Sequence, residues 1–346
     1  MEEGQVMKIL ITGAFGNVGK SVIEEAHKRK QEVVVFEVEN KKTRKEAHKF
    51  GKKVKTLLFG DIRNPQDIKN AVQDCEAVIH LAAIIPPTSK KNRELTMAVN
   101  YEGTINLVKA IKETKREIPL IFTSSVSVMG PTQHQNKLVD RNDPLVVTGN
   151  YEESKIKCEK YLKQNADNYI ICRLSGVLPV SSGISFGSFS LMEELFEMHP
   201  DMRLEMITDL DVATALVTAA EKLKAGSTEK NQAYIIAGGK ENGWQMKAEE
   251  FFSHLFGALS LSVPDRKYFT KDINNYHLDW YDTQKAQEEF DYQNHSFEDY
   301  LANMKKKLGI FKVFILLFRG TIMKKIVKTS PYYNEANKEA QKTLNL

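Results

Sequence analysis

A serine, a tyrosine and a lysine have the types and spacing that proton-transfer chemistry needs. Tyr151 and Lys155 stand four residues apart in a segment with helical spacing, so their side chains share one helix face, one turn apart. A neighbouring ammonium group lowers the pKa of a phenol, and the tyrosine can then act as a general acid or base near neutral pH. The hydroxyl of Ser125, which follows an apolar run at residues 120–123, can hydrogen-bond the same substrate oxygen. Tyrosine and lysine at this spacing are common by chance, so the rest of the chain decides their meaning.

A glycine-rich loop near the N-terminus predicts a dinucleotide site. The apolar run at residues 8–12 leads directly into Gly13, Gly16 and Gly19, and a segment with helical spacing follows. The glycines allow a tight turn, a close approach of the backbone to a pyrophosphate, and close packing of the helix on the strand. The N-terminus of the helix adds free N–H groups and the positive end of its dipole.

The end of the second apolar run bears on the choice of cofactor. Glu37 stands there, where a carboxylate accepts hydrogen bonds from the adenosine ribose hydroxyls and repels a 2′-phosphate. We therefore expect NAD, with NADP as the less favoured cofactor. Lys41, Lys42 and Arg44 leave NADP open, because a basic side chain there can hold a 2′-phosphate, but a solvated helix face is the interpretation that we prefer.

Short apolar runs alternate with amphipathic segments over the first 180 residues. The runs are rich in Ile and Val and do not alternate strictly, as expected of strands covered on both faces. The pattern predicts an α/β fold, a Rossmann-like doubly wound parallel sheet with a smaller C-terminal substrate lobe. We expect an NAD-binding domain at residues 1–180 with later segments returning to it, a substrate lobe at 181–300, and a basic amphipathic tail at 301–346. Strands are expected at 7–12, 32–36, 54–59, 77–81, 120–123, 169–173 and 233–237, and helices at 18–30, 65–73, 95–113, 151–164, 191–199 and 211–224.

Together these motifs resemble those of extended short-chain dehydrogenases/reductases, in the broad NAD-dependent epimerase/dehydratase family, from residue 13 to about 299. The further matching segments are Gly60-Asp61-Ile62-Arg63, His80-Leu81-Ala82-Ala83, Asn100-Tyr-Glu-Gly103-Thr104, Asp209-Leu-Asp211-Val-Ala213 and Asp282-Thr-Gln-Lys285. The resemblance implies that Tyr151 is the acid/base, that Lys155 binds the nicotinamide ribose, and that Ser125 polarises the substrate oxygen. The cofactor-binding residues that it implies are Gly13, Phe15, Gly16, Asn17, Val18, Gly19, Glu37, Asp61, Ile62, Leu81, Ala82, Ala83, Asn100, Thr123, Tyr151 and Lys155, with Ser124, Ser127 and Arg173 on the substrate side.

The resemblance leaves three functions open. We expect an NAD-dependent oxidoreductase that transfers a hydride between nicotinamide and a secondary alcohol or ketone. A nucleotide-sugar 4-epimerase with tightly bound NAD would use the same three residues, and a non-catalytic dinucleotide-sensing protein is the alternative from another class. Dehydration is disfavoured because Val-Ser-Val follows Ser125, without the Asp-Glu pair of the sugar dehydratases. Leu174 replaces the family's proline after Arg173, so a different substrate-side loop is expected there.

The composition of the presumed lobe bears on the substrate. Residues 174–200 contain no Lys or Arg, whereas a nucleotide sugar brings a second pyrophosphate that needs basic groups. Arg203 and Arg266 remain available, so the epimerase is weakened but stays open. The apolar residues Ile184, Phe186, Phe189, Leu191 and Met192 suit a lipid-like or steroid-like substrate as well as they suit a core.

Charge and cysteine content argue against several other classes of protein. Residues 301–346 hold ten Lys or Arg and two Glu, so with a net charge of +4 the rest of the chain is mildly acidic, which argues against nucleic acid as a partner. Three cysteines without a C-x-x-C pair argue against a disulfide scaffold and a cysteine zinc site. The eight histidines show no metal-ligand spacing, so no metal is expected. Without a signal peptide or a run of about 20 apolar residues, we expect a cytoplasmic protein.

The basic tail and two helices are candidate contact surfaces. On a helical wheel Lys305, Lys312 and Arg319 form one stripe, which suits a helix at residues 303–328 lying on anionic lipid. Packing on the body or on a second subunit is the interpretation that we prefer. The resemblance also implies a homodimer, paired through the helices after Asn100 and around Tyr151. The residues Ile105, Leu107, Val108 and Ile111 suit that face and equally the face toward the sheet.

Overall fold

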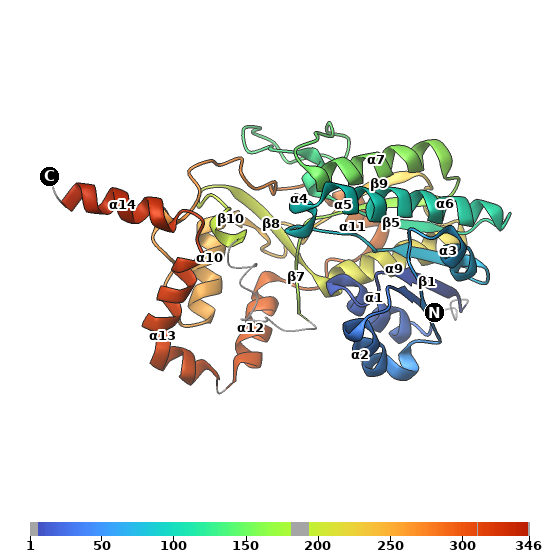
Figure 1. The fold of residues 1–346 in the computed structure, drawn as a ribbon, viewed down its shortest axis with the longest axis horizontal. Coiled ribbons are helices and arrows are strands. Elements are labelled where there is room, and N and C mark those ends of the chain that lie inside the picture. The colour runs from blue at the N-terminus through green and yellow to red at the C-terminus, as the bar shows by residue number, and fades with distance from the viewer. Residues whose placement is uncertain (1–5, 181–193, 310, 345–346) are drawn as a thin grey trace.

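A seven-stranded parallel sheet forms the centre of the larger half of the molecule (Figure 1). The structure is a computed structural model, and it describes residues 6–180, 194–309 and 311–344. The strands are β1 (Lys8–Thr12), β2 (Glu32–Glu37), β3 (Thr56–Phe59), β4 (Ala77–His80), β5 (Leu120–Ser125), β6 (Tyr169–Leu174) and β9 (Gln232–Ile236). They lie in the order β3-β2-β1-β4-β5-β6-β9, and every neighbouring pair is parallel. This order is that of a doubly wound sheet, and it confirms the fold class expected from the sequence.

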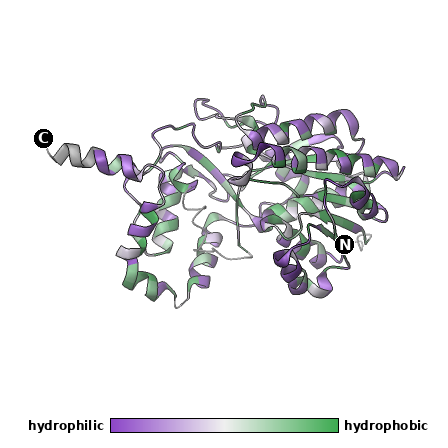
Figure 2. Ribbon diagram, in the orientation of Figure 1, coloured by the Kyte–Doolittle hydropathy of each residue, from purple (hydrophilic) through white to green (hydrophobic). Residues whose placement is uncertain are grey.

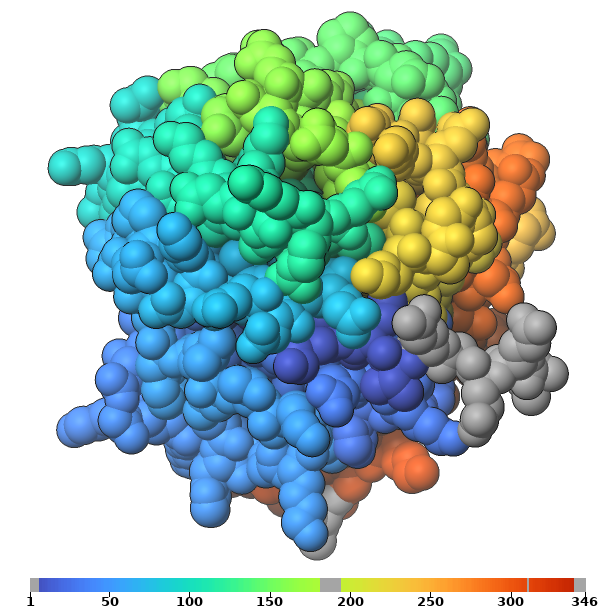
Figure 3. All heavy atoms as spheres, turned by 90° about the vertical axis from the view of Figure 1, so that its right-hand side faces the viewer, coloured from blue at the N-terminus to red at the C-terminus, as the bar shows by residue number. Residues whose placement is uncertain are grey.

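Helices cover both faces of this sheet, which explains why its strands are continuously apolar. The helices are α1 (Asn17–Lys28), α2 (Lys41–Phe50), α3 (Pro65–Val72), α6 (Gly103–Glu113), α7 (Asn150–Asn165), α9 (Asp209–Ala225) and α11 (Gln284–Phe290). In β1, Ile9 and Ile11 pack with α1 and α9, while Leu10 points to the other face and packs with α3, α6 and α7. Figure 2 shows hydrophobic residues gathered on the strands and hydrophilic residues on the outer helices. Figure 3 views this half end-on, with the blue and green parts of the chain over most of the visible surface.

The segment expected to form one helix at residues 95–113 is divided. A short helix α5 (Arg93–Thr96) is followed by a π-helical segment η2 (Met97–Glu102) and then by α6. π-helical turns often occur at functional sites, where they change the direction of a side chain. Asn100 lies within η2 and is buried.

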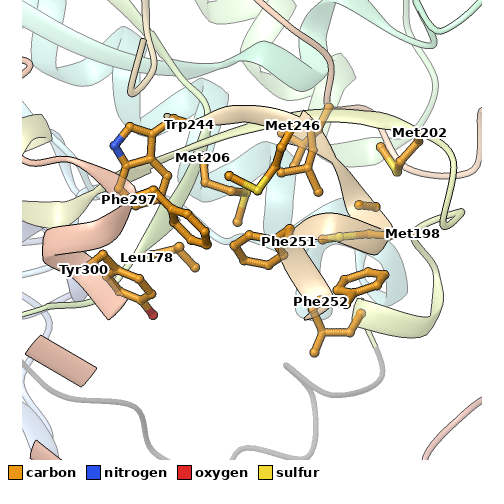
Figure 4. Close-up of a cluster of buried hydrophobic side chains, with 14 of the residues drawn as sticks. Leu178, Met198, Met202, Met206, Trp244, Met246, Phe251, Phe252, Phe297 and Tyr300 are labelled. Atoms are coloured by element: carbon orange, nitrogen blue, oxygen red, sulfur yellow. The ribbon is translucent and has the colours of Figure 1, made fainter. Parts of the chain in front are cut away.

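A second, three-stranded sheet supports the smaller lobe. It comprises β10 (Gln245–Lys247), β8 (Arg203–Thr208) and β7 (Gly176–Leu178), in that order. The sequence did not predict this sheet, since two of its strands are only three residues long. Helices α10 (Ala248–Ala258) and α12 (Phe297–Leu308) pack on it. Figure 4 shows the core that results, in which Met206, Met246, Phe251 and Tyr300 come together from β8, β10, α10 and α12.

Two segments that follow residue 200 in the sequence lie with the main sheet. Strand β9 extends the parallel sheet beside β6, and α9 packs against α1. The division at residues 180 and 300 stays a prediction. The expected loop at 181–188 lies outside the described residues, as do Ile184, Phe186, Phe189, Leu191 and Met192.

The tail differs from the single helix predicted at residues 303–328. Helix α12 ends at Leu308 and is capped by Gly309, whose φ of +45° is unfavourable for other residues. Helices α13 (Phe311–Lys328) and α14 (Tyr333–Leu344) follow. Lys305 therefore belongs to α12, whereas Lys312 and Arg319 belong to α13. The prediction that these three side chains form one stripe is wrong, because the helix that would align them is interrupted.

Candidate active site

A pocket of about 740 Å³ opens at the carboxyl ends of the central strands. It extends across β1 and β4, where the order of the strands reverses and where sheets of this kind bind their ligands. Most of the residues expected at a cofactor site or catalytic site line it. They are Gly13, Phe15, Gly16, Asn17, Val18, Gly19, Glu37, Asp61, Ile62, Leu81, Ala82, Ala83, Thr123, Ser124, Ser125, Tyr151 and Lys155.

The glycine loop has the geometry of a phosphate cradle. Gly13 has a φ of +69°, and a Cβ on it would lie 2.7 Å from the backbone of Ala82. A Cβ on Gly19 would lie 2.5 Å from the carbonyl oxygen of Ala14, so this glycine lets α1 pack against the loop. Helix α1 starts after Gly16 without a side-chain cap and without an acidic residue in its first turn. Its first N–H groups are therefore available to a pyrophosphate, and the residues present fit a dinucleotide.

Glu37 lies beside this loop at the end of β2. The N–H of Phe15 donates to its Oε1 atom over 2.8 Å, which fixes the carboxylate at the pocket wall. Burial raises the pKa of Glu37, and the backbone hydrogen bonds and Lys42 oppose that shift. Of the three basic residues that left NADP open, Lys42 lines the pocket, while Arg44 pairs with Glu39 outside it.

Asp61 and Arg63 form the next part of the wall. Arg63 donates from its Nε and its backbone N to Asp61 Oδ1, each over 2.9 Å. The guanidinium holds the pKa of Asp61 below its usual range, so this carboxylate stays charged at neutral pH. Arg63 itself lines the pocket, which the sequence analysis did not foresee although the residue stands in the quoted motif.

Ser125, Tyr151 and Lys155 meet at the other end of the pocket. Ser125 is the last residue of β5, and Tyr151 and Lys155 project from the first turns of α7. The Ser125 hydroxyl lies near enough to the Tyr151 phenol to lower its pKa. The ammonium of Lys155 donates to the Thr123 carbonyl over 2.7 Å and lies 5.9 Å from the centroid of the Tyr151 ring. The three residues that the sequence associated therefore adjoin one another.

The protonation of Tyr151 differs from the prediction. Burial raises the pKa of the phenol, the Glu152 carboxylate raises it further, and the Ser125 hydroxyl only partly opposes them. Burial also lowers the pKa of Lys155 to about 8. The expectation that the ammonium brings the phenol pKa toward neutrality is wrong for this structure, since desolvation of the phenolate is the dominant effect. At neutral pH both groups hold their protons, and the pair is set to donate one.

The sequence is similar to that of hydroxysteroid dehydrogenases. The profile of the 3-beta hydroxysteroid dehydrogenase/isomerase family matches residues 10–174. A 3-beta-hydroxysteroid dehydrogenase from Mycolicibacterium neoaurum is 28% identical, over 79% of this chain and 76% of the relative.

Solved structures of sugar-nucleotide epimerases share the fold. The UDP-glucose-4-epimerase of Stenotrophomonas maltophila, with bound NAD, has a TM-score of 0.72 at 18% identity and covers 89% of this chain and 99% of its own. The UDP-glucuronic acid 4-epimerase of Bacillus cereus has a TM-score of 0.68 at 22% identity, over 87% of this chain and 100% of its own. These matches confirm the resemblance to extended short-chain dehydrogenases/reductases and the fold that the sequence predicted.

Two buried polar residues hold the pocket walls in place. His80 bonds Thr12 Oγ1 over 2.6 Å and Thr104 Oγ1 over 3.0 Å, and burial lowers its pKa to about 3. The neutral imidazole thus ties β1 and β4 to α6. The Asn100 amide donates to the Ile84 carbonyl over 3.0 Å, and its oxygen accepts from the Ile84 N–H over 2.7 Å. Asn100 was expected at the cofactor, but the structure places it behind the loop that lines the pocket.

The three residues expected on the substrate side have different positions. Ser124 lines the pocket, and its buried hydroxyl has no hydrogen-bond partner among the described residues. Ser127 lies behind Ser125 and donates to its Oγ atom over 3.0 Å. Arg173 is not at the substrate side, because it is buried and binds both carboxylate oxygens of Glu159 on α7, at 3.0 and 2.8 Å.

Apolar residues complete the pocket, and of these the sequence analysis had named only Leu174. They come from the segment after β4, from α5 and η2, from the end of β6 and from β7, and they are Ile84, Ile85, Leu95, Val99, Leu174 and Val177. Their irregular spacing over separate segments gave no periodic signal. The basic side chains that line the described pocket are Lys42, Arg63 and Lys155, and none comes from these apolar segments.

Proposed function

We propose that the protein is an NAD-dependent dehydrogenase that interconverts a secondary alcohol and its ketone on an apolar, steroid-like substrate. The apolar wall beside Ser125, Tyr151 and Lys155 is the observation that carries this proposal. An uncharged ring system can bind against this wall without leaving a charge unpaired. A pyrophosphate would lose its hydration there, and no cation on the wall would compensate its charge. The similarity to a hydroxysteroid dehydrogenase supports the same substrate class.

Each polar residue has a task in this reaction. Bound NAD supplies the hydride acceptor or donor at the nicotinamide ring. Ser125 donates a hydrogen bond to the substrate oxygen and holds it beside the phenol of Tyr151, which exchanges a proton with it. Lys155 binds the nicotinamide ribose hydroxyls, and its positive charge favours release of the phenol proton during alcohol oxidation. Glu37 accepts hydrogen bonds from the adenosine ribose, and the glycine loop binds the pyrophosphate.

A nucleotide-sugar 4-epimerase is the second candidate. Solved structures that share this fold include several such enzymes, and the proposed catalytic residues serve either reaction. Arg203, which was left open as a phosphate ligand, is instead paired with Asp279 at 2.7 Å. Arg266 is paired with Asp201 and Glu249. These ion pairs weaken the epimerase, and the presence of Tyr151 and Lys155 weakens a purely sensing role.

Helices α6 and α7 are the proposed interface of a homodimer. Leu107 and Val108 are buried against the main sheet, so they are not available to a partner, while Ile105 and Ile111 are half-buried on α6. We retain the homodimer through α6 and α7 on the strength of these two residues, and sedimentation of the purified chain tests it. No helix in the described parts of the chain combines the length and the apolar character needed to span a bilayer. A cytoplasmic location, with residues 303–328 touching a membrane surface, remains our proposal.

Cofactor retention separates the two reactions. The protein is purified, denatured without added cofactor, and the released nucleotide is quantified. The dehydrogenase proposal expects little retained nucleotide, binding of added NAD in preference to NADP, and NADH formation with a 3-beta-hydroxysteroid. Near-stoichiometric NAD together with conversion of UDP-glucose, and no turnover of the steroid, would establish the epimerase instead. Tyr151→Phe is the matched control, because it must abolish either reaction while NAD binding persists.

A further inference from the structure

The outer face of α13 carries apolar side chains that nothing in the described structure covers. Six of the thirteen exposed large hydrophobic side chains of the described residues lie within residues 311–318. They are Phe311, Val313, Phe314, Leu316, Leu317 and Phe318, and Leu317 is 75% exposed. Exposed apolar groups gathered in this way mark a contact surface, because isolated proteins rarely leave them in water.

The opposite face of α13 already holds the helix to the body. Ile315 is buried, and Ile322, Met323 and Ile326 pack against the core of the smaller lobe. Figure 1 shows α13 at the periphery of that lobe, away from the parallel sheet. The exposed residues are thus not required for docking of the helix, and their side chains are free to enter another medium.

A basic group continues the same surface. At 100° per residue, Lys324 and Lys328 lie on the side of α13 that bears Leu317, and Lys325 lies beside Phe318. The last turn of α12, shortly before α13 begins, carries three exposed lysines, Lys305, Lys306 and Lys307. With Lys312 and Arg319, this stretch has eight cations and no carboxylate from residue 300 to 334. None of the eight forms an ion pair with a carboxylate within the described ranges.

We propose that α13, with the lysines at the end of α12, docks on an anionic lipid bilayer and lies in its interface. The aromatic and aliphatic side chains of residues 311–318 enter the acyl boundary, while the lysines remain among the headgroups. Lysine charge near such a surface adds to the affinity and falls off within a Debye length. This surface is independent of the pocket, so the inference goes beyond the proposed reaction and does not rest on it.

A second copy of the chain is a less suitable occupant. A self-complementary interface over the outer face of α13 would bring Lys324, Lys325 and Lys328 of two chains together without an opposing carboxylate. Like charges at a protein interface are repulsive, and lysine is depleted in such interfaces. An anionic bilayer satisfies both the apolar and the basic parts of the surface.

Vesicle flotation of the full chain tests the proposal. The vesicles contain phosphatidylcholine alone, or phosphatidylcholine with about a quarter phosphatidylserine. The wild type is expected to float with the anionic vesicles only, and less at high salt. The variant Lys324→Gln/Lys325→Gln/Lys328→Gln should bind roughly a hundredfold more weakly. The variant Phe314→Gln/Leu317→Gln should bind at least about tenfold more weakly, and both should melt as the wild type does, since the altered side chains are exposed.

Matched controls remove the same number of lysine charges and of apolar side chains at exposed positions outside α12 and α13. Lys52→Gln/Lys160→Gln/Lys240→Gln removes three exposed charges, and Leu138→Gln/Val147→Gln removes two exposed apolar side chains. Both controls should bind within about twofold of the wild type. Equal flotation with neutral vesicles, or equal loss in the controls, would overturn the proposal. A second result would also overturn it. In that result the wild type binds no vesicles and sediments as an oligomer, and the variant Phe314→Gln/Leu317→Gln sediments as a monomer. Vesicle binding by a protein that oxidises no steroid would leave this inference intact and reject only the proposed reaction.

Discussion

The hydroxyl of Ser127 lies 3.0 Å from the Oγ atom of Ser125 and donates to it. The Ser127 N–H donates to the same atom over 3.2 Å. Two donors on one side of Ser125 leave its own proton free to point toward Tyr151 and a substrate oxygen. Ser127 is therefore a positioning residue that acts through Ser125.

Replacement of Ser127 tests this relationship. Ser127→Ala removes one of the two donors, and we expect kcat to fall about fivefold with little change in KM, because a net hydrogen bond contributes about 1 kcal/mol. Ser127→Thr keeps the hydroxyl and should recover most of the loss. Steady-state kinetics of the three proteins provide the measurement. An equal loss in Ser127→Thr would show that the site tolerates no change of shape and would contradict the role assigned to the hydroxyl.

The pair of protonated groups predicts a pH profile for ketone reduction. Tyr151 holds its proton because burial raises its pKa, while the pKa of Lys155 is about 8. As the pH rises through about 8 the ammonium loses its charge, so kcat/KM for reduction should be level near neutrality and should decline above that pH. Lys155→Met should lower kcat/KM by about 10²-fold or more and remove the decline. Lys157→Met, on the same helix but paired with Glu153, should preserve both the rate and the profile.

The sequence was sufficient for features that depend on local spacing. Three features depend on only a few neighbouring residues: the glycine loop, Glu37 at a strand end, and Tyr151 with Lys155 one turn apart. All of them line one pocket. The parallel sheet followed from the alternation of short apolar runs with helical segments. Its strand order is the common solution for such a pattern.

Features that depend on distant contacts could not be predicted. Arg173 matched a motif, but its partner Glu159 stands 14 residues earlier on α7, and only the folded chain shows that they pair. The direction of the Tyr151 pKa depends on burial, which the spacing to Lys155 does not reveal. The break at Gly309 separates side chains that a continuous helical wheel aligns.

The ion pair of Arg173 and Glu159 is expected to stabilise the fold rather than to bind substrate. Arg173→Met leaves the Glu159 carboxylate buried without its partner, which should cost about 3–5 kcal/mol of unfolding free energy. The double variant Arg173→Met/Glu159→Met removes both charges and should recover most of that loss. Denaturant unfolding measures the stability, and KM for the alcohol should be unchanged in the double variant. A raised KM in a fully stable double variant would return Arg173 to the substrate side.

A buried carboxyl group in the smaller lobe should make stability depend on pH. Both oxygens of Glu205 accept hydrogen bonds, from the N–H groups of Gly239 and Tyr281 and from the amide of Gln245. Burial nevertheless raises the pKa of Glu205 to about 7, from 4.5 for the free side chain. Between these values the folded protein binds more protons than the unfolded chain.

The free energy of unfolding should therefore fall as the pH rises from about 4.5 to about 7, by about 3 kcal/mol for this group. The stabilising contribution is complete below the lower value and is lost as the pH passes through the higher one. Glu205→Gln cannot ionise, so its unfolding free energy should lack this decline even if the variant is less stable throughout. Glu241→Gln, an exposed acid of the same lobe, should keep the wild-type slope. Urea unfolding across this pH range measures the slopes, and identical slopes for Glu205→Gln and the wild type would show that Glu205 is ionised throughout.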